Sequence, residues 1–157
     1  MTPADASIVW PVYDTIFGGY PTLAAWRGDV WDKHIARAGF RLARAYQGQS
    51  LVGFAYGYTG EPGQWWTDNA RTVLAPDVAK AWLGGHFELV ELAVLPEAQG
   101  HGIGAGLLDA LLASRPEPRV LLQAHDGETA ASRLYSRAGF ARLVELPHGV
   151  VLVKDLR

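Results

Sequence analysis

Four glycines at alternate positions mark the part of the chain whose residues most clearly indicate a chemical function. Gly100, Gly102, Gly104 and Gly106 follow an apolar run that ends at Leu95, and leucines at helical spacing come next. This order predicts a strand, a glycine-rich turn and a helix, whose first backbone N–H groups have no partner inside the helix. Such N–H groups bind phosphate, and glycine lets an anion approach because it has no Cβ. The segment therefore predicts a site for a phosphorylated cofactor.

The spacing of the glycines does not match two common phosphate-binding loops. A P-loop needs Gly-Lys-Ser/Thr, and no such tripeptide follows Gly104 or Gly106. A Rossmann turn needs Gly-x-Gly-x-x-Gly directly after a strand, but residues 96–99 separate these glycines from the strand. The pattern that does match is Gln/Arg-x-x-Gly-x-Gly/Ala, filled by Gln99, Gly102 and Gly104.

This pattern resembles the acetyl-CoA pyrophosphate loop of the GCN5-related N-acetyltransferase (GNAT) family. A second pattern, Leu134-Tyr135 followed after three residues by Gly139-Phe140, is similar to the family's next helix. A strand-like run at 120–124 lies between the two patterns, as it does in the family. The resemblance in motifs extends from about Glu88 to Phe140, and outside that span it is architectural.

The resemblance implies how the chain would hold acetyl-CoA. The backbone amides of the loop would bind the pyrophosphate, a role that falls on Gln99, Gly100, His101, Gly102, Ile103 and Gly104. The strand before the loop is bulged in the family, and its free backbone groups pair with the pantetheine arm. Here those positions are Leu92, Ala93, Val94 and Leu95, whose side chains can equally be core residues.

The same resemblance suggests catalytic residues. Tyr135 takes the position of the family's acid, which protonates the departing thiolate, although a helical tyrosine here could also simply pack over the core. The acceptor amine must lose a proton, and Glu88 and Glu91 are the candidate bases. Strand alternation sends these two residues to opposite faces, so we expect one of them to face the site. Glu88 aligns with the family's glutamate base and Glu91 lies closer to the bulge, so the choice between them, or a water relay, stays open.

Aromatic residues are abundant in the half of the chain that would build the acceptor pocket. Trp65 and Trp66 follow a Gly-Glu-Pro-Gly loop, and we expect them to contact the acceptor. Aromatic walls beside a carboxylate suit a cationic or aromatic amine. Packing in a core is the alternative role for these tryptophans.

The periodicity predicts an α/β fold in a single acetyltransferase-like domain over residues 1–157. The resemblance implies a GNAT-like mixed, mostly antiparallel central sheet with splayed central strands, flanked by helices. The predicted helices are 12–23, 24–38, 76–83, 103–114 and 129–138, and the predicted strands are 40–46, 50–59, 87–95, 119–124, 140–145 and 150–154. The family usually opens with a strand, for which only Ser7–Trp10 is available, so we expect that strand to be short or missing.

Composition excludes several classes of function. The formal charge is −2 and the basic residues are dispersed, so no nucleic-acid or anionic-membrane surface is expected. Without cysteine there can be no disulfide, thiolate metal site or cysteine nucleophile. The five histidines lack paired spacing, so no metal site is expected. No apolar run has the length of a membrane span and no export pattern opens the chain, which favours a cytoplasmic location.

The resemblance thus implies an enzyme that transfers an acetyl group from acetyl-CoA to a primary amine of a small molecule, peptide or protein, by direct attack in a ternary complex. A module that binds or senses acyl-CoA without transferase activity is the alternative. A nucleotide-binding role of the glycine loop is a third. Dimers are frequent in the family, but no interface pattern decides between a monomer and a homodimer. The acceptor and the length of the acyl chain also stay undecided at this point.

Overall fold

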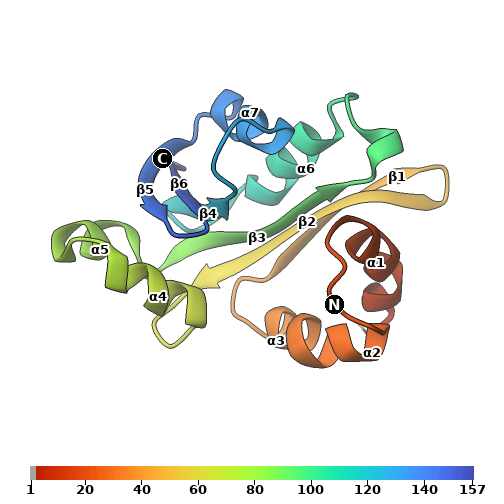
Figure 1. The fold of residues 1–157 in the computed structure, drawn as a ribbon, viewed down its shortest axis with the longest axis horizontal. Coiled ribbons are helices and arrows are strands. Elements are labelled where there is room, and N and C mark those ends of the chain that lie inside the picture. The colour runs from red at the N-terminus through yellow and green to blue at the C-terminus, as the bar shows by residue number, and fades with distance from the viewer. Residues whose placement is uncertain (1–2) are drawn as a thin grey trace. The chain divides into compact units, whose positions relative to one another are not determined.

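The computed structural model describes residues 3–157, drawn as a ribbon in Figure 1. Six strands form a sheet in the order β1-β2-β3-β4-β6-β5. The strands are β1 (Arg41–Gln47), β2 (Ser50–Gly60), β3 (His86–Val94), β4 (Arg119–Ala124), β5 (Ala141–Leu146) and β6 (Gly149–Asp155). The helices are α1 (Pro3–Ile16), α2 (Leu23–Trp26), η1 (Arg27–Trp31), α3 (Asp32–Ile35), α4 (Trp65–Val73), α5 (Pro76–Trp82), η2 (Pro96–Ala98), α6 (Ile103–Leu112) and α7 (Ala130–Arg137). The first compact unit comprises the chain up to Tyr58 with Glu91–Ala113, and the second comprises Thr59–Val90 with Ser114–Arg157.

In the first unit, β1 and β2 form an antiparallel hairpin whose two faces carry different side chains. On one face of β2, Tyr56 packs edge-on against Trp31, with ring centroids 5.5 Å apart. Gly53 is out of phase with Tyr56, and a Cβ built on it would lie 3.2 Å from the Leu107 side chain of α6. Figure 1 shows α1, α2 and α3 on one side of this hairpin and α6 on the other. The first unit therefore has an aromatic layer under α1–α3 and an aliphatic layer under α6.

The first helix begins earlier than the predicted range 12–23. Ser7–Trp10, the segment considered for the family's first strand, is part of α1, and within residues 3–40 the structure has no strand. Ala6, Val9 and Tyr13 are all buried, and their spacing of three and four residues is that of a helix with one buried face. The helix ends at Ile16, just before Gly18 and Gly19, whose φ values of +59° and +88° suit glycine.

Two further helical segments differ from the sequence prediction. The predicted helix 24–38 is present over residues 23–35, where α2, the π-helical η1 and α3 follow one another without a break, and it ends at Ile35. The helix α4 was not indicated by the sequence at all. It buries Thr67 and Ala70, which are three residues apart and so share one helix face.

In the second unit, β4 lies between β3 and β6. It pairs in parallel with β3 through Phe87–Val120 and Glu88–Leu121, and antiparallel with β6 from Arg119–Asp155 to Ala124–Val150. The strands β5 and β6 form the closing hairpin. A core of Ala70, Ala79, Leu83, Leu121, Val151 and Val153 lies between these strands and the helices α4 and α5. These pairings confirm the predicted mixed, mostly antiparallel sheet flanked by helices.

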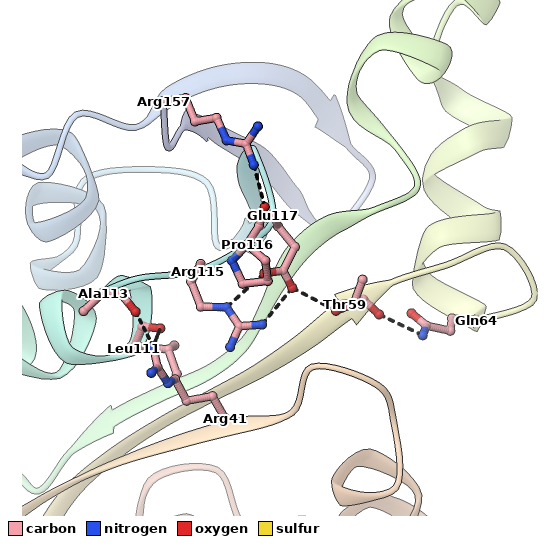
Figure 2. A network of polar contacts seen from close by, with 9 residues as sticks. All are labelled: Arg41, Thr59, Gln64, Leu111, Ala113, Arg115, Pro116, Glu117 and Arg157. Atoms are coloured by element: carbon pink, nitrogen blue, oxygen red, sulfur yellow. Dashed lines mark hydrogen bonds and ion pairs between the residues drawn. The ribbon is translucent and has the colours of Figure 1, made fainter.

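A buried ion pair stabilises the connection from α6 to β4 within the second unit (Figure 2). Arg115 donates to Glu117 at 2.7 Å, and their side chains are 8% and 4% exposed. Thr59 Oγ1 donates to the same carboxylate at 2.8 Å, and the guanidinium lies 4.3 Å from the centre of the Phe87 ring. Because its partners donate to the charged form, they lower the pKa of Glu117 although burial alone would raise it.

No helix among residues 3–157 combines the length and the apolar character that crossing a membrane requires.

Candidate functional site

The glycine-rich loop lies at the N-terminus of α6, as predicted. Gly100 and Gly102 have φ values of +81° and +78°, in the left-handed region, and Gly102 is the N-cap residue of the helix. A Cβ built on either glycine would meet nothing within 4 Å, so the space beside this backbone is open. The loop therefore combines the backbone conformation and the room that close approach of a ligand requires.

The first backbone N–H groups of α6 are directed out of its N-terminus. The first turn of the helix closes with Gly106 N–H donating to Gly102 O at 3.0 Å, which places Ile103, Gly104 and Ala105 before the first helical donor. No side chain caps this end. The N-terminus of a ten-residue helix also carries about half a positive charge. These donors and this charge suit an anion with several oxygen atoms, such as a diphosphate.

The side chain of Gln99 connects the loop to the end of β3 by a hydrogen bond. Its Nε2 donates to Val94 O at 3.0 Å, and Leu95 N–H donates to Val52 O at 2.8 Å. A ligand could therefore pair with Leu95 only through the carbonyl. Of the four residues expected along the pantetheine arm, Ala93 is buried and Leu92, Val94 and Leu95 are half-buried. The side chain of His101 is exposed at the loop.

Glu91 lies half-buried in the last part of β3, and its carboxylate has an unusual setting. Burial raises its pKa from 4.5 to about 7. Across residues 3–157, neither a hydrogen bond nor an ion pair to this carboxylate is described. A group with a pKa of about 7 exchanges protons readily near neutral pH, as a general base must.

Tyr13 is a candidate site residue that the motifs did not indicate. It is 7% exposed on α1, and its pKa is raised to about 12, by burial first and then by the charge of Glu91 and by Tyr20. Tyr13 and Glu91 both belong to the first unit. A signal in the sequence was the run of aromatic residues Trp10, Tyr13 and Phe17 at helical spacing.

The other candidate base, Glu88, belongs to the second unit. It is 5% exposed in β3, where it pairs with Leu121 of β4. Glu91 belongs to the first unit.

Tyr135 lies in the second unit, on a helix with a well-defined start. Thr129 and Ser132 form a capping box at the beginning of α7, with each side chain bonded to the other's backbone N–H. Tyr135 is 6% exposed and packs edge-on against Phe140 at 5.5 Å, while Phe140 N–H donates to Tyr135 O at 3.0 Å. The Leu-Tyr and Gly-Phe pairs of the motif therefore contact each other and hold the tyrosine in place.

The two tryptophans expected to contact the acceptor lie on α4 in the second unit and have different surroundings. Trp65 is 74% exposed. Trp66 packs against the core of the second unit and donates through Nε1 to Gln123 Oε1 at 2.9 Å.

In the described part of the chain, no group of three or more His, Asp or Glu side chains could hold a metal ion.

Comparison with known proteins identifies the family. Residues 39–142 match the family described as "Acetyltransferase (GNAT) domain". The chain belongs to the GNAT family. A GCN5-like protein acetyltransferase of Mycobacterium tuberculosis is 34% identical over 152 residues, which cover 78% of this chain and 74% of the relative. A mycothiol acetyltransferase of Salinispora tropica is 36% identical over 111 residues, 52% of this chain and 36% of the relative, so the match spans about a third of that protein.

Solved structures show the same fold. An acetyltransferase from Thermus thermophilus superimposes with a TM-score of 0.71 at 19% identity, covering 99% of this chain and 94% of the other. The PaiA N-acetyltransferase of Thermoplasma acidophilum, solved in complex with coenzyme A, has a TM-score of 0.65 at 17% identity, covering 99% and 95%. This GNAT chain therefore has the family's fold over its described length.

GNAT enzymes are acyltransferases that use acetyl-CoA, and the loop before α6 fits that cofactor. The open space beside Gly100 and Gly102 admits a bulky anion, and the uncapped N–H groups of α6 offer it donors. The fit thus rests on the chemistry of the loop in this chain as well as on the family.

Proposed function

We propose that this GNAT chain acetylates a primary amine of a small molecule, a peptide or a protein, by direct attack in a ternary complex. Acetyl-CoA supplies the acetyl group on a thioester. The observation that carries the proposal is the pair of features in the first unit: a glycine loop at residues 99–104 before the uncapped N-terminus of α6, and a carboxylate with a pKa of about 7. An acyl-CoA binding module would need the first feature but not the second.

Glu91 is the general base in this proposal. An ammonium group has a pKa near 10 and no lone pair, so the acceptor must lose a proton before it reacts. The Glu91 carboxylate accepts that proton because burial raises its pKa toward neutrality. Glu88, only 5% exposed between neighbouring strands, is less able to reach an acceptor.

Tyr135 holds the proton that the departing sulfur needs. The support is its place in the Leu-Tyr…Gly-Phe motif and the fixed helix that carries it. A tyrosine hydroxyl carries a proton that it can donate as a general acid.

The cofactor would be held by the backbone of the first unit. Residues 99–104 bind the pyrophosphate in the proposal, and Leu92, Ala93, Val94 and Leu95 pair with the pantetheine arm. We further propose that residues 1–157 act as one acetyltransferase domain, because the family match at 39–142 includes parts of both compact units.

The names of two relatives support the range of acceptors. One is called a protein acetyltransferase and the other is named for mycothiol. Trp65 remains a proposed acceptor contact because its ring is exposed. Trp66 is a weaker candidate, since its indole N–H is already bonded to Gln123.

The release of coenzyme A thiol from acetyl-CoA tests the proposal. The wild-type protein is assayed with a panel of primary amines, with Tyr135→Phe and Glu91→Gln as variants. We expect amine-dependent thiol release that falls at least tenfold in each variant. Tight binding of coenzyme A without thiol release for any amine would instead favour the binding module, and full activity of Tyr135→Phe would remove the acid role.

A further inference from the structure

Gly53 of β2 is buried where three elements of the first unit meet. A Cβ built on it would lie 2.9 Å from the carbonyl oxygen of Ala93 in β3, 3.2 Å from Cδ1 of Leu107 in α6 and 3.4 Å from Cγ2 of Val94. Cβ atoms in proteins essentially never come within 3.0 Å of another heavy atom, and the nearest atom here is backbone. Position 53 therefore requires glycine if β3 is to keep its place beside β2.

The carbonyl group of Ala93 departs from the regular geometry of a sheet. In regular strands the carbonyl groups lie close to the plane of the sheet, whereas Cβ atoms point out of it. The Ala93 oxygen instead lies beside the position that a Cβ of Gly53 would take, on the face that carries α6. Next to this point, Leu95 N–H donates to Val52 O at 2.8 Å, so β3 cannot move away from β2 here without losing a hydrogen bond. A methyl group at position 53 would therefore press on a backbone that is held in place.

The face of the β1–β2 hairpin under α6 is made of small residues around Gly53. Gly53 pairs with Ala45 of β1, and Ala55, two residues further on and so on the same face, pairs with Ala43. Figure 1 shows α6 on one side of this hairpin and α1–α3 on the other. The small residues leave room for the Leu107 side chain of α6, which would touch a Cβ at position 53. The missing side chain at Gly53 therefore also sets how closely α6 approaches the sheet.

The two elements that contact Gly53 carry the two halves of the proposed cofactor site. Ala93 and Val94 belong to the segment proposed to pair with the pantetheine arm, and Leu107 lies one turn beyond the N–H groups proposed to bind the pyrophosphate. Val94 O also accepts from Nε2 of Gln99, at the start of the loop, at 3.0 Å. Pyrophosphate and pantetheine are covalently joined in coenzyme A, so both halves bind at once only if their spacing matches that of the cofactor.

We propose that Gly53 is a positioning residue of the cofactor site, and that its lack of a side chain sets the distance between the end of β3 and the N-terminus of α6. The inference rests on the cofactor contacts of the proposed function and adds a buried residue that acts through them. A larger residue at position 53 moves the strand that pairs with pantetheine away from the helix that binds the pyrophosphate. Coenzyme A then binds less tightly, although each half of its site is chemically unchanged.

Gly53→Ala tests this role through the affinity for coenzyme A. We expect the Kd from calorimetry and the KM for acetyl-CoA to rise at least fivefold, while the KM for the acceptor amine stays within twofold. Gly60→Ala is the matched control, because Gly60 also lies in β2 and a Cβ there would lie 2.1 Å from Nε2 of His86, in the second unit. The control should lower the melting temperature and leave the Kd unchanged, since destabilisation reduces the folded fraction and not the affinity of the folded molecules.

A change on the helix tests the same spacing if Gly53→Ala does not fold. Leu107→Ala keeps the glycine and removes the side chain of α6 that lies over position 53. We expect the Kd for coenzyme A to rise at least threefold. Leu111→Ala is its control, because Leu111 is also buried in α6 but lies one turn further from the loop. This control should destabilise the fold while the Kd changes less than twofold.

The outcomes separate this inference from the proposed function. If the wild-type protein does not bind coenzyme A, or if Gly102→Val binds it as tightly as wild type, the proposed cofactor site fails and the role of Gly53 fails with it. If Gly102→Val weakens binding but Gly53→Ala keeps the wild-type Kd, the positioning role is wrong while the cofactor site stands. An equal rise in Kd for Gly53→Ala and Gly60→Ala would also overturn the positioning role, because the effect would then follow from destabilisation in general.

Discussion

Arg115 and Glu117, two residues apart in the turn before β4, form a salt bridge of 2.7 Å with both side chains buried. Figure 2 shows that Thr59 adds a third member to this pair. A buried pair of this kind contributes less by its own attraction than by the cost of leaving one charge alone.

Replacing Glu117 should therefore destabilise the fold strongly. Glu117→Ala leaves the guanidinium buried without its carboxylate, and we expect a loss of about 3–5 kcal/mol in the free energy of unfolding, measured with urea at pH 7. Glu145→Ala is the control, because Glu145 pairs with Arg142 on the surface and is 72% exposed; this variant should lose no more than about 0.5 kcal/mol of stability.

Since the folded pKa of Glu117 is lowered from 4.5, the contribution of Glu117 to stability is lost as the pH falls through that lowered pKa, and the difference between Glu117→Ala and wild type should shrink in acid. Equal losses for the two variants at pH 7 would contradict the burial of the pair.

Gly60 should not tolerate a side chain. A Cβ built on it would lie 2.1 Å from Nε2 of His86, and His86 is fully buried. Gly60→Ala should therefore cost about 1–3 kcal/mol of stability. Gly106→Ala, in α6 with nothing within 4 Å of the added carbon, should instead be neutral or stabilise by up to about 1 kcal/mol. Thermal unfolding of the two variants checks the contrast, and a stable Gly60→Ala protein would show that the imidazole can be displaced.

Glu91→Gln should lower the activity but raise the stability of the folded protein above neutral pH. As a base, Glu91 works when ionised, so wild-type kcat/KM should rise with pH through about 7, and the variant should lose both that rise and most of the activity. The folded pKa is above the ordinary 4.5, so between pH 4.5 and 7 the folded state binds more protons than the unfolded state. Stability from this group is therefore present below pH 4.5 and is lost as the pH rises through 7.

The corresponding stability measurement compares melting temperatures. Glu91→Gln should melt higher than wild type at pH 8, because no charge is buried, and close to wild type at pH 5. A variant that loses activity and stability together at pH 8 would indicate a structural role for Glu91 instead.

Gly102→Val should abolish cofactor binding while the protein remains folded. Valine strains a backbone with φ of +78° and places methyl groups where the anion would approach. We expect the Kd for coenzyme A, measured by calorimetry, to rise at least tenfold. Gly48→Val is the control, because Gly48 has φ of +61° and open space in the β1–β2 turn, so the strain is similar and no ligand is involved. Its melting temperature should fall by a similar amount with an unchanged Kd, and unaltered affinity in Gly102→Val would count against the loop.

The loop at 99–104 could be predicted because its chemistry is local. Glycine spacing, the preceding strand and the following helix all lie within about 20 residues. The Leu-Tyr…Gly-Phe motif is local in the same way, and Tyr135 and Phe140 do contact each other.

The influence of the Glu91 charge on the pKa of Tyr13 could not be predicted, because it depends on how the first unit folds. Tyr13 and Glu91 are 78 residues apart, and no periodicity relates them. The early start of α1 was missed for a related reason: the helix is stabilised by burial of Ala6, Val9 and Val12, which outweighs the hydrogen bond lost at Pro11 inside it. Tertiary packing also explains α4, whose single buried face is too short to give a clear period.

The helical start of the chain has a consequence for β1. With no strand before it in the described chain, β1 is the outermost strand on its side of the sheet, and its outer backbone groups have no partner strand. Such an edge invites aggregation unless charged side chains obstruct it. Arg44 pairs with Asp5 of α1 at 3.2 Å, and Arg41 donates to the carbonyls of Leu111 and Ala113 at the end of α6. Arg41 and Arg44, each bonded to a helix, thus place positive charges on the edge strand, where another molecule could otherwise add a strand by backbone pairing.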